Sequence, residues 1–375
     1  MKCLGLLFLA VSVAGRFTDD FYKLVDKENG DKNLICSPLS VEIVMSMVYM
    51  AAEGNTATEL RKVLKLPADK KEVSKKYKEL LTVLEGREKV ANLALANRLY
   101  VNNNFQLVPE YNQMVRDSFK AEAEAISMAN PNNAASIINK WVNDQTRGKI
   151  KNIVSSDTIT PDLVVVLLNA IYFKGQWKYK FNPEYTRKAD FQVTTKNRLP
   201  VEMMLQTDEF RAANLKSLDA KVIELPYRNS SLSMLIFLPN KVDGLQELES
   251  KIADFSGPLK KMRVMLVLPK FKIEFSADLV KFLKTMGIRE AFSSSAKLGG
   301  LVKKLAVKID KVFQKAFIEV NEDGAEAAAV TVGTVVPMSV APSPDMKFIA
   351  NHPFAYVIRD EKTIYFQGHF VKPGM

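Results

Sequence analysis

The side chains that most often perform catalysis or bind metals are scarce in this chain. Its 375 residues include only two histidines and two cysteines. His352 and His369 both lie within the last two dozen residues, and neither belongs to an HExxH or paired-cysteine spacing. Cys36 lies in the apolar stretch LICSP, a setting that raises the pKa of a thiol and leaves it unreactive. The sequence therefore predicts no metal site and no cysteine nucleophile, and it favours structural positions for both histidines.

The glycine and serine motifs of common enzymes are also absent. The sequence contains no GxGxxG, no Walker A and no GxSxG motif. This removes the usual nucleotide-binding and hydrolase signatures, and no catalytic triad can be assembled from the residues present. We therefore expect a protein that is not an enzyme and that uses no cofactor.

The first fifteen residues resemble a secretory signal peptide. Lys2 precedes an apolar run at positions 4–13, and small residues follow at positions 12–15. The run is shorter than the roughly 20 residues that a membrane-spanning helix needs. A buried N-terminal helix is the alternative. Cleavage after residue 15 would remove Cys3, the only possible disulfide partner of Cys36, and would yield a secreted, extracellular protein without a membrane anchor.

A secreted protein can be glycosylated at an Asn-x-Ser/Thr sequon, and this sequence offers one candidate. Asn229 begins the triplet Asn-Ser-Ser in what reads as a turn, so Asn229 is a candidate glycosylation site.

The chain is basic, with 53 Lys and Arg against 42 Asp and Glu and a formal net charge of +11. Residues 260–315 hold fourteen Lys and Arg against four Asp and Glu. A local surplus of this kind indicates at most an acidic surface or a polyanionic glycan as partner, whereas nucleic acid binding is not predicted. A second row, formed by Lys71, Lys75 and Lys78, is interleaved with acids and reads as a solvated helix face.

The elements that position these residues fall into two groups. Up to about residue 150 the apolar spacing is helical, and from about residue 163 strands take over. The run at 164–168 is apolar throughout, as in a strand buried on both faces, and residues 270–275 alternate strictly. Two hairpins are expected, at 222–238 and 354–370. The order indicates an α+β fold, and without repeats or linkers we expect one domain over residues 16–375.

One segment, residues 321–344, does not fit a passive scaffold. It has no charged residue from position 327 to position 344. Alternate positions carry mostly small side chains that could lie beneath a strand without displacing a packed core: Ala325, Ala327, Ala329, Thr331, Gly333 and Val335. An alanine-rich linker is the alternative, but a linker needs no such alternation. The segment reads as a latent strand held out as a loop.

Several stretches carry a resemblance to a known family. Residues 321–329, NEDGAEAAA, resemble the hinge of an inhibitory serpin. NLICSPLS at 33–40, LNAIYFKGQW at 168–177, HPF at 352–354 and FQGHF at 366–370 are similar to other serpin blocks. The resemblance spans nearly the whole mature chain. It implies three β-sheets, about nine helices, a metastable native state and an exposed reactive-centre loop at about 322–344.

The resemblance also implies a mechanism. A target protease cleaves the loop, forms an acyl-enzyme and is trapped as the loop inserts into the main sheet. Counting sixteen residues from Glu322 places the reactive bond at Met338-Ser339, preceded by Val336 and Pro337. The partner would be an elastase-like or chymotrypsin-like extracellular serine protease, bound by a monomeric inhibitor. Inhibition of a cysteine protease, or a non-inhibitory serpin that acts as carrier, storage protein or chaperone, is the alternative.

Further positions carry over from the family's motifs. The hinge comprises Glu322, Gly324, Ala325, Glu326, Ala327, Ala328 and Ala329. Glu322 would face Lys270 near Trp177, at the breach where the loop enters the sheet. Ser37, Ser40 and Asn169 match the shutter, and Gln314 stands where the family often has histidine.

Overall fold

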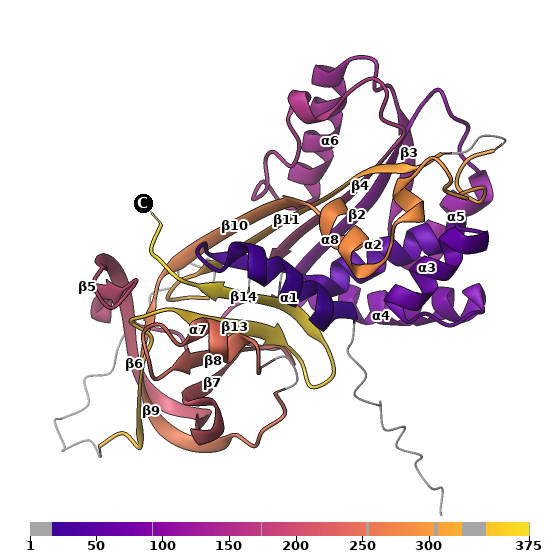
Figure 1. The fold of residues 1–375 in the computed structure, drawn as a ribbon. Helices are drawn as coiled ribbons and strands as arrows, with labels where there is room; N and C mark the ends of the chain where they lie inside the picture. The colour runs from indigo at the N-terminus through magenta and orange to yellow at the C-terminus, as the bar shows by residue number, and fades with distance from the viewer. Residues whose placement is uncertain are drawn as a thin grey trace, which may run out of the picture.

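The computed structural model describes residues 17–91, 93–173, 175–252, 255–303, 307–324 and 343–374 (Figure 1). The expected signal peptide therefore lies outside the described residues. So do hinge positions 325–329 and positions 336–339 around the expected reactive bond. No helix in the described part is both long and apolar enough to cross a membrane.

The described residues form eight α-helices, most of them in the first half of the chain. Two begin at clear sequence signals, because Ser37 and Asn130 accept backbone hydrogen bonds as N-caps and a proline follows each. The helices are α1 (Phe17–Asn29), α2 (Pro38–Ala51), α3 (Gly54–Leu64), α4 (Lys70–Ala91), α5 (Pro109–Phe119), α6 (Pro131–Gln145), α7 (Leu245–Glu249) and α8 (Val280–Met286).

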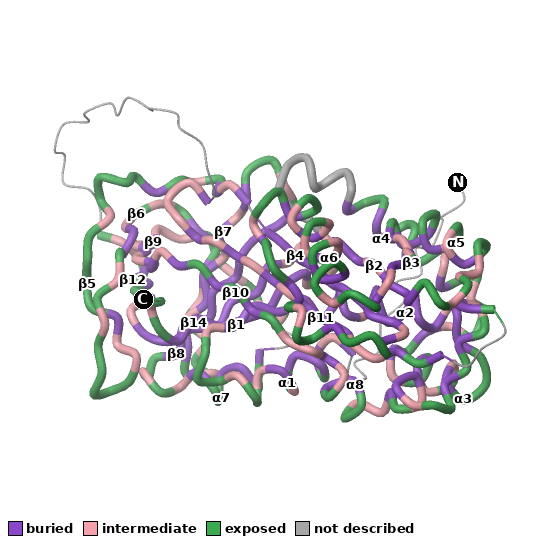
Figure 2. Tube along the Cα trace, turned by 90° about the horizontal axis from the view of Figure 1, so that it is seen from above, coloured by how far each residue is buried: buried purple, intermediate pink, exposed green. Residues whose placement is uncertain are grey.

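A five-stranded sheet forms the centre of the molecule. Its order is β10 (Phe271–Asp278), β11 (Ile309–Val320), β4 (Val165–Phe173), β2 (Leu93–Asn102) and β3 (Glu122–Ile126). All nine residues of β4 are buried, as the apolar run predicted, because α6 packs on one face of the sheet and α2 on the other. Figure 2 shows this buried interior. β4 and β11 are parallel neighbours in the middle of the sheet.

The second sheet has nine strands. Its order is β1 (Leu34–Cys36), β14 (Ile364–Phe370), β13 (Phe354–Arg359), β8 (Ser233–Pro239), β7 (Ala220–Pro226), β6 (Arg198–Leu215), β9 (Lys260–Pro269) and β12 (Met346–Ile349), with β5 (Arg187–Gln192) beside β6. Both expected hairpins are present, as β7 with β8 and β13 with β14. β6 pairs with β5 at its start, with β9 along its middle and with β7 at its end. Hydrogen bonding thus joins the strands of the described residues into two sheets, where the resemblance implied three.

The helical reading of the first 150 residues was wrong for β1, β2 and β3. β2 has the sequence LALANRLYVN, whose leucines and alanines favour a helix. It forms a strand because it pairs with β4 along nearly its whole length and with β3 along its second half. The α+β class itself is confirmed.

Both histidines are structural, as expected. His369 on β14 has no exposed surface, and its ring nitrogens lie 2.9 Å from a Glu249 carboxylate oxygen and 2.7 Å from the Lys32 carbonyl oxygen. Burial alone would lower the pKa of His369, but its contacts with Asp26 and Glu249 outweigh burial and raise that pKa to about 10. A charged imidazole therefore connects α1, α7 and β14.

Candidate functional site

The site begins with the turn at which the chain leaves β11, residues 321–324. The Gly324 amide donates to the Asn321 carbonyl at 3.2 Å, which closes the turn. Gly324 has φ +86°, and a Cβ there would lie 2.4 Å from the Gly175 carbonyl oxygen and 2.5 Å from the Trp177 nitrogen. Only glycine fits this position, because both the backbone angle and the space exclude a side chain.

The turn packs against residues 175–181, which follow β4 and are called the strap below. The Trp177 amide donates to the Asp323 carbonyl at 3.1 Å, and the Phe181 amide donates to the Glu322 carbonyl at 3.0 Å. The Trp177 indole donates to the Asn321 carbonyl at 3.0 Å. Three consecutive residues of the turn are therefore bonded to the strap through their backbone carbonyls.

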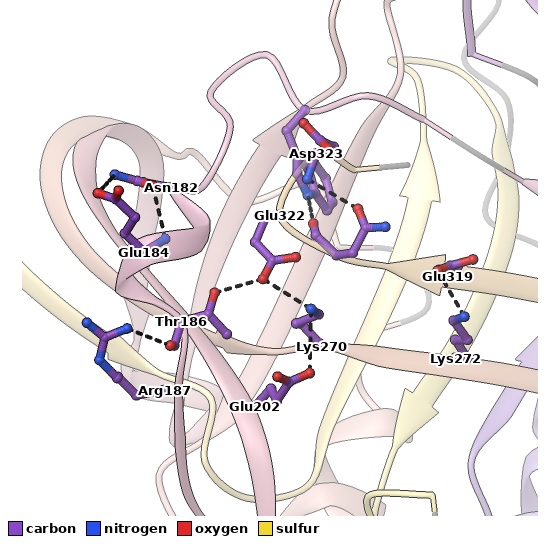
Figure 3. A network of polar contacts seen from close by, with 12 residues as sticks. Asn182, Glu184, Thr186, Arg187, Glu202, Lys270, Lys272, Glu319, Glu322 and Asp323 are labelled. Carbon is purple, nitrogen blue, oxygen red and sulfur yellow. Dashed lines mark hydrogen bonds and ion pairs between the residues drawn. The ribbon is translucent and has the colours of Figure 1, made fainter. Parts of the chain in front are cut away.

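The Glu322 side chain holds the turn through contacts outside the strap. Its carboxylate lies 3.2 Å from the Lys270 ammonium and accepts a 2.8 Å hydrogen bond from the Thr186 hydroxyl (Figure 3). Lys270 also lies 3.5 Å from Glu202. Burial disfavours the charged form of Glu322, but hydrogen bonds from a backbone amide, Thr186 and Lys270 outweigh it and lower the pKa of Glu322. The structure thus brings together Glu322, Lys270 and Trp177, the residues assigned to the breach.

The second group of assigned residues lies within the five-stranded sheet, across the boundary between β4 and β11. Gln314 and Asn169 are direct partners in the register, and the Gln314 amide donates to the Asn169 side-chain oxygen at 2.7 Å. Gln314 also donates to the Ser37 carbonyl at 3.3 Å, and Asn169 donates to the Ser40 hydroxyl. Ser37, Ser40, Asn169 and Gln314 have no exposed surface. The four residues assigned to the shutter therefore form one buried network.

Sequence reasoning missed two members of this network. The Asn97 side-chain oxygen on β2 accepts a 2.5 Å hydrogen bond from Asn169, and the Cys36 thiol donates to Gln314 at 3.2 Å. Burial raises the pKa of the Cys36 thiol well above its usual range, in agreement with an unreactive cysteine. Asn97 and Arg98 interrupt an otherwise apolar run, so Asn97 could have been found had that run been read as a buried strand.

The far end of the loop is fixed separately. The Asp345 amide donates to the Arg263 carbonyl, and the Arg263 amide donates to the Asp345 carboxylate, both at 2.8 Å. β12 then continues parallel to β9. The two described ends of the loop, Gly324 and Ser343, thus lead to different sheets.

Asn229 lies outside these two groups of residues, whereas the basic segment, residues 260–315, includes both Lys270 and Gln314. Asn229 is exposed in the turn between β7 and β8, with φ +51°. The basic segment spans β9, β10, α8 and β11, and seven of the thirteen cations among its described residues form ion pairs with carboxylates. These cations are Lys261, Lys270, Lys272, Lys281, Lys308, Lys311 and Lys315. Polyanion binding stays a prediction, and this pairing weakens it.

The fold and the site define a protein class: an α+β body in which the chain leaves β11 at a turn beside the central pair of parallel strands, β4 and β11. A family model described as Serpin (serine protease inhibitor) matches residues 12–373. The chain therefore belongs to the serpin family, and its function is serine protease inhibition.

Named relatives agree with this assignment. The chain is 49% identical over 379 residues to serine protease inhibitor 42Dd of Drosophila melanogaster, with 100% of both chains covered. It is 34% identical to the leukocyte elastase inhibitor of Sus scrofa, over 96% of this chain and 98% of that one. The crystal structure of Serpin48 from the insect Tenebrio molitor superimposes with a TM-score of 0.87, at 35% identity and 96% coverage of each chain.

Proposed function

We propose that the chain inhibits its target as a suicide substrate, with Met338-Ser339 as the reactive bond. The nucleophile of the protease attacks the Met338 carbonyl, and the bond to the Ser339 nitrogen breaks. The Ser339 amine leaves with a proton, and Met338 stays bound to the protease as an acyl ester. The hinge and loop then insert between β4 and β11 before water releases the ester.

The observation that carries this proposal is the turn at 321–324 above a parallel strand pair. Because the chain already reverses direction there, a strand starting at Ala325 would run antiparallel to β11 and therefore also to β4. Insertion would replace one parallel interface by two antiparallel ones, which are the more stable kind per residue. The small side chains at alternate positions of the loop would fit under the helices that cover the sheet.

The target class follows from the side chain at the reactive bond. Met338 is unbranched and apolar, so it suits an elastase-like or chymotrypsin-like pocket and cannot pair with the acid of a trypsin-like one. One relative is named a leukocyte elastase inhibitor. We further propose that residues 1–15 direct secretion, that residues 16–375 form a single domain that acts as a monomer, and that Asn229 carries a glycan outside the cell.

The test is incubation with elastase, chymotrypsin and trypsin, followed by denaturing electrophoresis and mass spectrometry. We expect a complex with elastase or chymotrypsin that resists denaturant, together with a released C-terminal fragment that begins at Ser339. Cleavage without a covalent complex would instead support a non-inhibitory serpin. A fragment that begins elsewhere would move the reactive bond.

A further inference from the structure

Besides the Trp177 indole, a second side chain of the strap contacts the turn. The Lys180 ammonium lies 2.9 Å from a carboxylate oxygen of Asp323, and the two side chains are 35% and 37% exposed. Figure 3 shows that the Glu322 carboxylate points toward Lys270, whereas Asp323 lies on the side of Glu322 away from Lys270. Two ion pairs therefore hold the turn, one to Lys270 just before β10 and one to Lys180 in the strap.

The two ion pairs differ in what they connect. Lys270 precedes β10, which is the antiparallel neighbour of β11, so the Lys270 pair joins elements on the same side of the site of insertion. Lys180 belongs to the strap, which continues from β4 on the other side. The Lys180 pair therefore spans the boundary at which the sheet must open.

Opening the sheet is incompatible with this contact. A strand inserted between β4 and β11 moves them apart by about 4.8 Å, the spacing of neighbouring strands. If the strap moves with β4, the contact of 2.9 Å between Lys180 and Asp323 breaks, together with the backbone bond from Trp177 to Asp323. Asp323 is also two residues before Ala325, so this contact must be released before the first loop residue can enter.

We propose that Lys180 and Asp323 form a clamp that sets the rate at which the loop begins to insert. This proposal rests on the suicide-substrate mechanism proposed above. In that mechanism insertion competes with hydrolysis of the acyl ester, so the clamp fixes the fraction of encounters that end in inhibition. The same clamp slows spontaneous insertion of the uncleaved loop. Lys180 and Asp323 act as positioning residues, because their effect is on the opening of the sheet and not on the chemistry at Met338.

The test compares Lys180→Gln and Asp323→Asn with Lys178→Gln. Lys178 is an exposed strap lysine over the Tyr179 ring, so its substitution removes the same charge without affecting the clamp. The first readout is the stoichiometry of inhibition, measured with a protease that cleaves a measurable share of the wild-type protein as substrate. The second is the rate at which the intact protein converts to a heat-stable, inactive form.

Each clamp variant should insert about two- to fivefold faster, as expected from the loss of one partly exposed ion pair. The stoichiometry of inhibition should fall toward one and spontaneous conversion should accelerate, while Lys178→Gln behaves as wild type. The association rate constant multiplied by the stoichiometry of inhibition measures how fast the two proteins meet and form the acyl ester. The clamp acts after these steps, so this product should stay unchanged. The charge-reversed double variant Lys180→Asp, Asp323→Lys should restore the wild-type ratio of inhibition to hydrolysis of the acyl ester.

The outcomes separate the two proposals. If the wild-type protein forms covalent complexes but both clamp variants partition and convert like Lys178→Gln, the clamp is refuted and the suicide-substrate mechanism stands. If the wild-type protein forms no covalent complex with any protease, both proposals fail. A change in thermal stability without a change in partitioning would mean that the ion pair is only structural.

Discussion

The shutter gives the prediction that can be worked out most fully, the substitution Gln314→Ala. The Gln314 amide is fully buried and makes three contacts: with the Asn169 side chain, the Ser37 carbonyl and the Cys36 thiol. Removing it leaves the Asn169 oxygen and the Ser37 carbonyl without this donor, at a cost of about 1–3 kcal/mol for buried groups. The cavity left behind adds about 1 kcal/mol. We therefore expect a loss of about 3 kcal/mol in native-state stability.

The effect should be coupled to Asn169, because the two side chains bond directly across the β4–β11 boundary. Urea unfolding of Gln314→Ala, Asn169→Ala and the double variant forms a double-mutant cycle. We expect a coupling energy of about 1 kcal/mol or more. Gln206→Ala is the control, since Gln206 lies on β6 and makes one long bond of 3.4 Å, so this variant should lose little stability.

Two results would refute this reasoning. Additive losses within about 0.5 kcal/mol would show that Gln314 and Asn169 do not act together. A Gln314→Ala loss no larger than that of Gln206→Ala would show that the buried network contributes nothing to native stability. A faster conversion of Gln314→Ala to the heat-stable form would agree with a shutter that holds β4 and β11 together.

Three further predictions follow. Ala325→Arg should turn the inhibitor into a substrate, because a buried arginine blocks the first step of insertion; unchanged covalent complex on a denaturing gel would contradict the hinge assignment. Oxidation of Met338 to the sulfoxide makes its side chain polar and should weaken inhibition of elastase, and treatment with a reductase should restore the association rate. The pKa of His369 is raised from 6.5 to about 10, so its stabilising charge is fully present below pH 6.5 and is lost as the pH rises through 10. Stability should therefore fall over this range by up to about 1.4 kcal/mol per pH unit, and His369→Gln should lack this slope in urea titrations at pH 6, 8 and 10.

Much of the fold could be read from local patterns. The buried run of β4, the alternation of β10 and the two hairpins each depend on residues close together in sequence, and the structure confirms all of them. β2 was missed because its composition favours a helix, and only its two partner strands make it a strand. The extent of β6 was missed for a related reason, since its three partners lie in different parts of the chain.

The sequence by itself determined the family and the α+β class, because these depend on short ordered motifs and on periodic spacing. The tertiary structure decided which side chains meet. Lys180 and Asp323 are 143 residues apart, and Gln314 lies 278 residues from Cys36. No local pattern encodes such pairs, because they form only when the strap packs against the turn after β11, and when β1 packs against β11. The scarcity of histidine and cysteine in the sequence argued against catalysis. In the fold, His369 and Cys36 make buried contacts that stabilise the native state.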